Sequence, residues 1–331
     1  MKTLLLKESE IKKAADIIKQ GGTVVFRTET VYGIGADATR ETAVAKVFGA
    51  KNRPPVNPLI IHFDSLKTLF KKFPDVDLGT RHVLNTVKSA ITVILPRPEW
   101  IPLITTGGLE TVAIRVPDCK FAQKFIKKCG LPLAAPSANT STRPSPTRWE
   151  DAHDDLNGRV DAILCGTQTQ IGVESTVVKV IPLASPPCSK TFNKTDYTIQ
   201  ILRLGGVNSD ELTKLTGIKV LYHPTKESPG TQFKHYSPKC PLLLVDDAGT
   251  IGDYSQYNDL IKEFRTKYGR FPKIKIIRKT DLGKNGIEVA KNLFSKIRDL
   301  EKDADYIVCE RFPDTVEYQT INERLQKASS N

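Results

Sequence analysis

With 331 residues, 39% of them hydrophobic and 26% charged, the chain is long enough for two domains and has the composition of a soluble globular protein. Its net charge is +12, and residues 1–206 hold 28 Lys and Arg against 19 acidic residues; this favours anionic partners, RNA included, but also suits an ordinary solvated surface. No apolar run approaches the roughly 20 residues of a membrane span, and six scattered cysteines argue against a disulfide framework or zinc site, so we expect a cytoplasmic protein without membrane association.

The first part of the chain alternates short helices and strands irregularly. Apolar residues at helical spacing predict a helix over 11–18, which ends at Gly21-Gly22. Further helices are expected at 43–51 and 122–129, and strands at 23–26, 58–63, 91–95, 111–116, 133, 160–164, 175–180 and 201–204. This order predicts an α/β domain over residues 1–206, with a twisted mixed sheet and helices packed against it.

A change in pattern follows this domain. Residues 207–238 contain a short helical stretch and a Ser228-Pro229-Gly230 turn, which predicts an interdomain linker that acts as a mobile lid. Residues 239–331 then read as βαβαβ, with strands at 242–245, 274–277 and 306–309. We predict a small Rossmann-like parallel sheet without the glycine fingerprint of nucleotide binding, and the sequence does not indicate its role.

The strand over 111–116 gives the clearest physical clue to a site. Side chains alternate across a strand, so Thr111, Ala113 and Arg115 share the face opposite the valines. An arginine beside a small residue suits bidentate capture of a carboxylate. The alternative is a surface ion pair, with Asp118 as the partner.

Three other segments carry polar residues next to predicted strand ends. Lys51 and Arg53 precede a double proline, which suits a rigid phosphate clamp but equally a basic loop tip. Gly33 and Gly35 follow Thr28-Glu29-Thr30, yet the P-loop spacing is absent. The hydroxyl and amide groups of the segment 137–147 bind ligands or cap turns, and taken one by one these features leave both readings open.

In this order, however, Thr28-Glu29-Thr30-Val31-Tyr32-Gly33-Ile34-Gly35, Lys51-Asn52-Arg53-Pro54-Pro55 and Ser137-Ala138-Asn139 resemble the threonylcarbamoyl-AMP synthases of the YrdC type. The resemblance covers about residues 5–206, and the segment ending in His235-Tyr236-Ser237-Pro238 resembles the linker of the two-domain members. It implies a YrdC-like domain around a basic cavity, with the linker folded over its mouth.

The resemblance implies a nucleotidyl transfer in which L-threonine, bicarbonate or CO2, and ATP form threonylcarbamoyl-AMP and pyrophosphate. A downstream tRNA threonylcarbamoyl transferase would then modify tRNAs that read ANN codons. Mg2+ is expected on the ATP phosphates, with no organic cofactor and no metal ligands from protein side chains. No protein nucleophile is needed, so positioning, charge neutralisation and exclusion of water carry the reaction.

Site residues follow from the resemblance position by position. The threonine-binding positions match Thr28, His62, Arg115 and Ser175. The ATP-binding positions match Lys51, Arg53, Pro55, Thr111, Ala135, Ser137, Asn139, Ser145, Arg203 and Tyr236. Lys51 and Arg53 are expected to stabilise phosphates, and Tyr236 to close over the nucleotide.

The chain departs from the family pattern at three places, namely Arg27, Leu204 and the segment 85–92. These departures, with the positive charge, keep a second hypothesis open, a catalytically silent RNA-binding or regulatory protein of the same fold. A third hypothesis, a carbamoyl-transfer module like that of hydrogenase maturation proteins, is opposed by the absence of zinc-finger cysteines and of an acylphosphatase-like segment.

Overall fold

The computed structural model describes residues 2–183, 191–225, 235–246 and 255–329. The chain divides into two units, of which unit 1 comprises residues 1–141 and 145–233, and unit 2 comprises residues 142–144 and 234–331. Among the described residues, no helix is long and apolar enough to cross a bilayer. The five cysteines in the described ranges are free.

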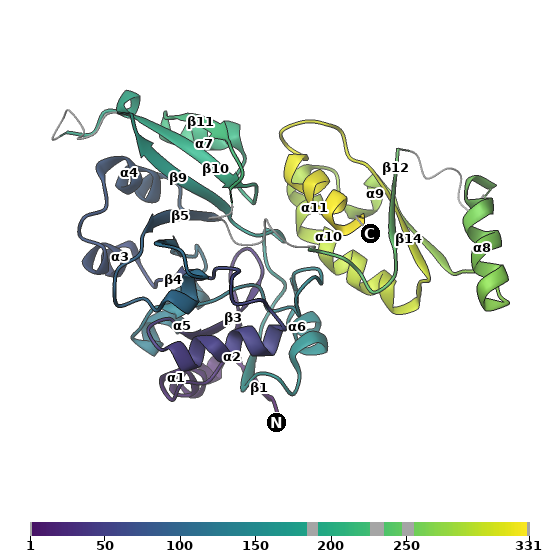
Figure 1. Ribbon diagram of the computed structural model, residues 1–331, viewed down its shortest axis with the longest axis horizontal. Helices are drawn as coiled ribbons and strands as arrows, with labels where there is room; N and C mark the ends of the chain where they lie inside the picture. Colours follow the sequence, from purple (N-terminus) through teal and green to yellow (C-terminus); the bar gives the residue numbers. More distant parts are fainter. Residues whose placement is uncertain (1, 184–190, 226–234, 247–254, 330–331) are drawn as a thin grey trace. The chain divides into compact units, whose positions relative to one another are not determined.

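Unit 1 is built on one large mixed sheet, as predicted (Figure 1). Its eleven strands have the order β1-β8-β2-β3-β7-β4-β6-β5-β9-β10-β11. The strands are β1 Leu4–Lys7, β2 Val24–Arg27, β3 Tyr32–Asp37, β4 Ile60–His62, β5 Ile91–Pro96, β6 Thr111–Arg115, β7 Leu133–Ala134, β8 Ala162–Cys165, β9 Thr176–Pro182, β10 Tyr197–Arg203 and β11 Lys219–Tyr222.

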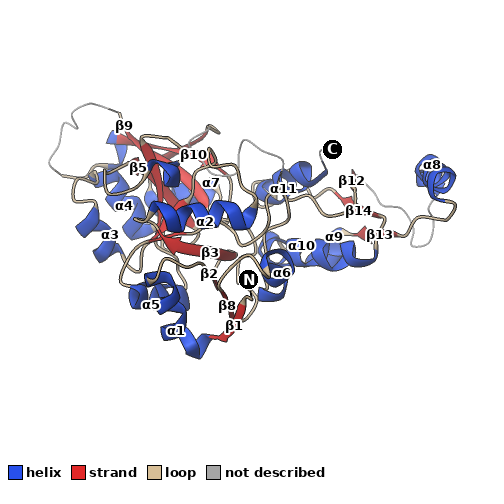
Figure 2. Ribbon diagram, turned by 60° about the horizontal axis from the view of Figure 1, so that its bottom comes forward, coloured by secondary structure: helices blue, strands red, loops and turns tan. Residues whose placement is uncertain are grey.

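Helices cover this sheet in two groups. The helices are α1 Ile11–Lys19, α2 Glu41–Lys51, α3 Leu66–Lys72, α4 Leu78–Thr86, α5 Lys120–Cys129, α6 Trp149–Leu156 and α7 Ser209–Thr216. Helices α1 and α5 lie against each other (Figure 2) and share a core cluster with β1, β2 and β8. A larger cluster takes in α2, α3, α4, α6 and α7, so apolar side chains are buried on both faces of the sheet.

The expected linker over 207–238 begins as an ordered part of unit 1, which corrects the expectation that the whole segment connects two domains. Helix α7 buries Leu212 completely, and β11 pairs in parallel with β10. The side chain of Asn208 caps α7 by accepting from the backbone N–H of Glu211 at 2.9 Å. Residues 226–234, the central part of the expected lid, lie outside the described residues.

Unit 2 contains a small parallel sheet, as the βαβαβ pattern predicts. Strands β12 Leu242–Val245, β13 Ile274–Ile277 and β14 Tyr306–Glu310 are joined by α8 Asn258–Tyr268, α9 Lys279–Leu282 and α10 Gly286–Leu300, and α11 Gln319–Ser329 follows. The strand order β12-β14-β13 places the last strand in the centre. In this respect the sheet departs from the consecutive strand order of a Rossmann half.

Candidate functional site

The site residues of unit 1 gather where neighbouring strands of the large sheet end. In the register of the parallel pair β4 and β6, His62 lies directly beside Arg115. The next strand, β5, carries Thr92, and Ser175 directly precedes β9. All four side chains are buried. The alternation predicted for 111–116 is confirmed, because Val112 and Ile114 pack in the main core while the intervening Ala113 joins a separate apolar cluster.

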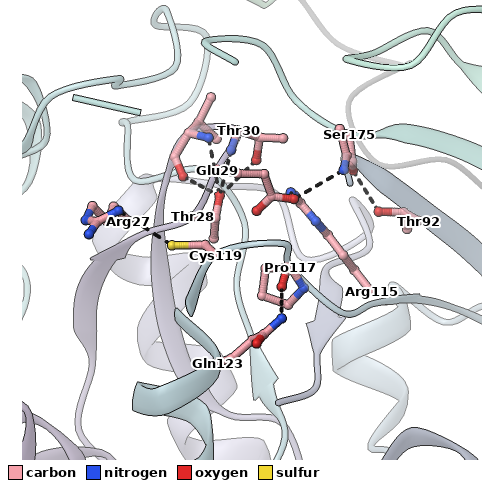
Figure 3. A network of polar contacts seen from close by, with 12 residues as sticks. Arg27, Thr28, Glu29, Thr30, Thr92, Arg115, Pro117, Cys119, Gln123 and Ser175 are labelled. Carbon is pink, nitrogen blue, oxygen red and sulfur yellow. Dashed lines mark hydrogen bonds and ion pairs between the residues drawn. The ribbon is translucent and has the colours of Figure 1, made fainter. Parts of the chain in front are cut away.

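Arg115 is paired with a residue that the sequence did not identify as its partner. Its Nη2 donates to Oε1 of Glu29 at 2.6 Å, and both side chains are at most 4% exposed (Figure 3). Glu29 comes from the loop between β2 and β3, within the Thr28-Glu29-Thr30 motif. The alternative of a surface pair with Asp118 is therefore wrong.

The loop that carries Glu29 is held by its own hydroxyls and by the segment before β9. Thr28 Oγ1 donates to the carbonyl of Val31 at 2.8 Å and lies 2.9 Å from Thr30 Oγ1. The carbonyl of Glu29 accepts from the backbone N–H groups of Gln170 and Ile171, at 3.1 and 2.9 Å. These bonds fix where the Glu29 carboxylate enters the site.

The charges of this site follow from burial and from Arg115. Burial opposes ionisation of Glu29, but the attraction of Arg115 outweighs it and lowers the pKa of the carboxyl below its ordinary value. Burial, and to a lesser extent repulsion from Arg115, lowers the pKa of His62 to about 3. At neutral pH Glu29 is therefore a carboxylate beside Arg115, and His62 is a neutral imidazole.

A hydroxyl network adjoins the ion pair. Thr92 Oγ1 and Ser175 Oγ lie 2.7 Å apart (Figure 3). Arg203, at the end of β10, donates through Nη2 to the carbonyl of Ser175 at 2.7 Å. Two predicted site residues, Ser175 before β9 and Arg203 at the end of β10, are thus in direct contact.

Lys51 ties the end of α2 to the segment 137–139. Its Nζ donates to the main-chain carbonyls of Ser137 and Asn139, each at 2.5 Å, and the side chain is buried. Ser137 Oγ in turn donates to Oδ1 of Asn139 at 2.5 Å. These three predicted nucleotide-binding residues are brought together.

Arg53 donates hydrogen bonds within its own loop. Its Nη2 donates to Oδ1 of Asn57 at 2.6 Å and to the carbonyl of Pro58 at 2.8 Å. The loop is therefore held rigid, as the double proline predicts, while Pro55 is exposed. The phosphate role of Arg53 stays a prediction.

Three further predicted site residues, Ser145, Ala135 and Thr111, also lie in unit 1. Ser145 Oγ donates to Oε1 of Glu174 at 2.5 Å, and both are buried. The backbone N–H of Ala135 donates to the carbonyl of Ile60 at 2.9 Å. Thr111 lies at the start of β6, opposite Pro96 of β5.

Tyr236 belongs to unit 2. Its ring stacks on Phe294 with centroids 5.3 Å apart, and the guanidinium of Arg324 lies 5.0 Å from its centre. These contacts bury the ring within unit 2. Closure of Tyr236 over a nucleotide stays a prediction.

The structure shows what each of the three departures from the family pattern contacts. Arg27 forms a partly buried ion pair with Glu8, and Leu204 is buried. In the segment 85–92, Ala90 has a φ of 51° and its backbone N–H donates to Oε1 of Glu29 at 3.2 Å. This segment therefore supports the Glu29–Arg115 pair.

Sequence reasoning missed Glu29, Thr92 and Glu174 as parts of the site. Glu29 stood inside the Thr28-Glu29-Thr30 motif without a role, and Glu174 directly precedes the predicted residue Ser175. Each proves to be the buried partner of a predicted site residue. An acidic residue that is flanked by hydroxyl residues at the end of a buried strand indicates a site residue. The reason is that a buried carboxylate needs a hydrogen-bond donor or a cation as its partner.

Comparisons with known proteins cover nearly the whole chain. The family described as "Telomere recombination" matches residues 16–189, and "Threonylcarbamoyl-AMP synthase, C-terminal domain" matches residues 207–330. The threonylcarbamoyl-AMP synthase of Pyrococcus abyssi is 34% identical over 98% of this chain and 95% of its own length. That of Bacillus subtilis is also 34% identical, over 97% and 93%.

A solved structure extends the likeness to three dimensions. The crystal structure of P. abyssi Sua5 complexed with L-threonine matches with a TM-score of 0.81 and 32% identity, over 99% of this chain and 98% of that one. The resemblance seen in the motifs is thereby confirmed along nearly the whole chain. The chain belongs to the threonylcarbamoyl-AMP synthase family.

Proposed function

We propose that the protein condenses L-threonine, bicarbonate and ATP into threonylcarbamoyl-AMP with release of pyrophosphate. The observation that supports this most directly is the buried Glu29–Arg115 pair, which lies in a polar site with Ser175, Thr92 and a neutral His62. A fixed guanidinium in a buried setting is suited to an amino-acid carboxylate. The family membership supplies the reaction type.

Each group of residues has a positioning task in this proposal. Arg115 holds the carboxylate of threonine, with Thr28, His62 and Ser175 beside it. Lys51, Arg53, Pro55, Thr111, Ala135, Ser137, Asn139, Ser145 and Arg203 bind ATP, and Tyr236 contributes from unit 2. The threonine carbamate attacks the α-phosphorus of ATP, and the protein orients the two reactants and keeps water away.

We assign Mg2+ to the phosphates of ATP. Within the described ranges, His, Cys, Asp and Glu form no group of three or more that is arranged to hold a metal ion. Mg2+ commonly keeps several waters and binds through substrate phosphates, which suits a site whose own charges near the phosphates are cationic.

The product suits a downstream transferase that passes the threonylcarbamoyl group to tRNA, because a mixed anhydride with AMP is an activated donor. We propose that this transferase, rather than the synthase, contacts the anticodon region, and that the reaction takes place in the cytoplasm. Direct RNA binding is a separate prediction, based on the positive charge of residues 1–206. If it occurs, the affinity for RNA should fall steeply as the salt concentration rises.

The test is incubation of the purified protein with ATP, Mg2+, bicarbonate and L-threonine. We expect pyrophosphate release and a threonylcarbamoyl-AMP peak by mass spectrometry, both dependent on threonine and bicarbonate. ATP binding without any such product would contradict the proposal and favour the catalytically silent alternative.

A further inference from the structure

The two oxygens of the Glu29 carboxylate have different surroundings. Oε1 accepts from Nη2 of Arg115 at 2.6 Å and from the backbone N–H of Ala90 at 3.2 Å. Oε2 is buried and has no hydrogen-bond partner among the described residues, and the same is true of Nε of Arg115. The buried ion pair therefore contains one acceptor atom, Oε2 of Glu29, and one donor atom, Nε of Arg115, that have no partner among the described residues.

Such leftover groups are costly in a folded protein. A buried polar group without a partner loses its hydration and gains nothing in return, and the loss is larger when the group is charged. Native proteins pair nearly all such groups, so each exception calls for an explanation such as an ordered water, an ion, a ligand or a catalytic role. Glu29 and Arg115 lie in the candidate site, so a ligand is the natural partner for both atoms.

The chemistry of the two atoms defines that ligand. Nε of Arg115 donates, so it requires an acceptor such as a carboxylate, whereas ionised Glu29 only accepts and requires a donor, preferably a cation. The ring of His62 is neutral at physiological pH and therefore supplies no competing cation. A zwitterionic α-amino acid carries both required groups on one carbon atom.

We propose that Oε2 of Glu29 accepts a hydrogen bond from the amino nitrogen of the amino-acid substrate, which makes Glu29 the residue that selects an amino acid over the corresponding hydroxy acid. This inference rests on the proposed function, since it names how the same site recognises threonine. The nitrogen carries three hydrogens as an ammonium and one in the carbamate. The bond to Glu29 can therefore persist from bound substrate to product.

The ion pair gives Glu29 a second effect that the experiment must separate. Loss of the Glu29 charge also loosens Arg115, and this weakens every ligand that has a carboxylate. The ratio of two affinities removes this common effect, provided that the ligands differ only at the amino group. L-threonine and 2,3-dihydroxybutanoate of matching configuration are such a pair.

The experiment is isothermal titration calorimetry of both ligands with the full-length wild type and with Glu29→Gln. We expect the wild type to prefer threonine and the preference to fall about 10- to 100-fold in the variant, because a charge-assisted hydrogen bond contributes about 1.5–3 kcal/mol. ATP affinity should stay within about twofold.

Glu8→Gln is the matched control. Glu8 is the partner of Arg27 in another partly buried Arg–Glu pair of unit 1, so its substitution should leave the preference unchanged. Thermal unfolding of both variants shows whether they fold.

Two results would overturn the proposal. Equal weakening of both ligands by Glu29→Gln would show that Glu29 only orients Arg115. Equal affinity of the wild type for both ligands would show that the amino group is not read, and this result needs no variant at all. A wild type that binds neither ligand would instead contradict the proposed function, so the two failures are distinguishable.

Discussion

Glu29 and Arg115 form an ion pair whose side chains are almost fully excluded from solvent. Removal of one partner from such a pair leaves an uncompensated buried charge. The face of β6 on which Arg115 lies could be predicted from the sequence, because alternation along a strand is a local property. Its partner, 86 residues away along the chain, could not, because that contact depends on how the β2–β3 loop packs.

We expect Arg115→Ala to abolish threonine-dependent turnover and to lower the free energy of unfolding by about 3–5 kcal/mol. ATP affinity should change little, since Lys51 and Ser137 hold their contacts independently of Arg115. Pyrophosphate release measures turnover, urea unfolding measures the free energy of unfolding, and ATP titration measures the affinity for ATP.

The control is Lys273→Ala, which breaks an exposed pair with Asp303. This change should lower the free energy of unfolding by less than about 1 kcal/mol. Near-normal turnover of Arg115→Ala would contradict the proposal that Arg115 binds the carboxylate of threonine.

The buried imidazole of His62 makes stability depend on pH. Its pKa is about 3 in the folded protein and about 6.5 in an unfolded chain. The unfolded state therefore binds the proton first, so the contribution of neutral His62 is complete above pH 6.5 and is lost as the pH falls. Well below pH 6.5 the loss approaches about 1.4 kcal/mol per pH unit.

The measurement is urea unfolding between pH 7 and pH 4.5, with wild type compared with His62→Gln. We expect the wild type to lose stability more steeply on acidification, because Gln cannot take up the proton. Parallel curves for the two proteins would show that His62 is solvated rather than buried.

At the scale of elements, helices and strands with a regular spacing of apolar residues could be predicted from the sequence. Elements whose form depends on contacts with the rest of the fold could not. Helix α1 could be predicted because Ile11, Ala14, Ala15 and Ile18 mark one helix face. Strand β11 is only four residues long and owes its extended form to its pairing with β10. Short strands of this kind have no pattern of their own, which is why 219–222 was assigned to a linker.

We expect Leu212→Ala in α7 to lower the free energy of unfolding by about 2–5 kcal/mol, because the side chain is fully buried in the main core. Leu215→Ala in the same helix is the control, since Leu215 is 42% exposed and should change stability by less than about 1 kcal/mol. Urea unfolding compares the two. Equal small effects would mean that α7 is not part of the folded core of unit 1.

At the scale of the whole molecule, unit 2 includes three residues from the middle of the chain. Arg143 forms a bidentate pair with buried Glu301, and Nη2 of Arg298 donates to the carbonyl of Pro144 at 2.5 Å. The backbone N–H of Ser237 also donates to the carbonyl of Thr142, at 2.8 Å. Residues 142–144 are thus held by several strong contacts within unit 2. The assignment of 239–331 as a separate domain could not include them, because no local pattern marks them.

We expect Glu301→Gln to increase amide hydrogen exchange at residues 140–144, because the buried charge pair that holds Arg143 is lost. Hydrogen exchange followed by mass spectrometry on the full chain is the measurement. Asp303→Asn removes an exposed acid from the same short 3-10 helix as Glu301 and should leave exchange at 140–144 unchanged. Similar exchange in both variants would mean that the Arg143–Glu301 pair does not hold this segment.

The membership of residues 142–144 has a consequence for how the protein can be divided. The chain passes from one unit to the other after Ser141, after Pro144 and after Phe233, so no single cut separates them. A fragment that stops at residue 233 still carries Arg143 but lacks Glu301, and it exposes a cationic loop that the intact protein shields. A gene that encodes the first unit as a stand-alone protein would therefore need a redesigned loop at 142–144 as well as a new stop codon.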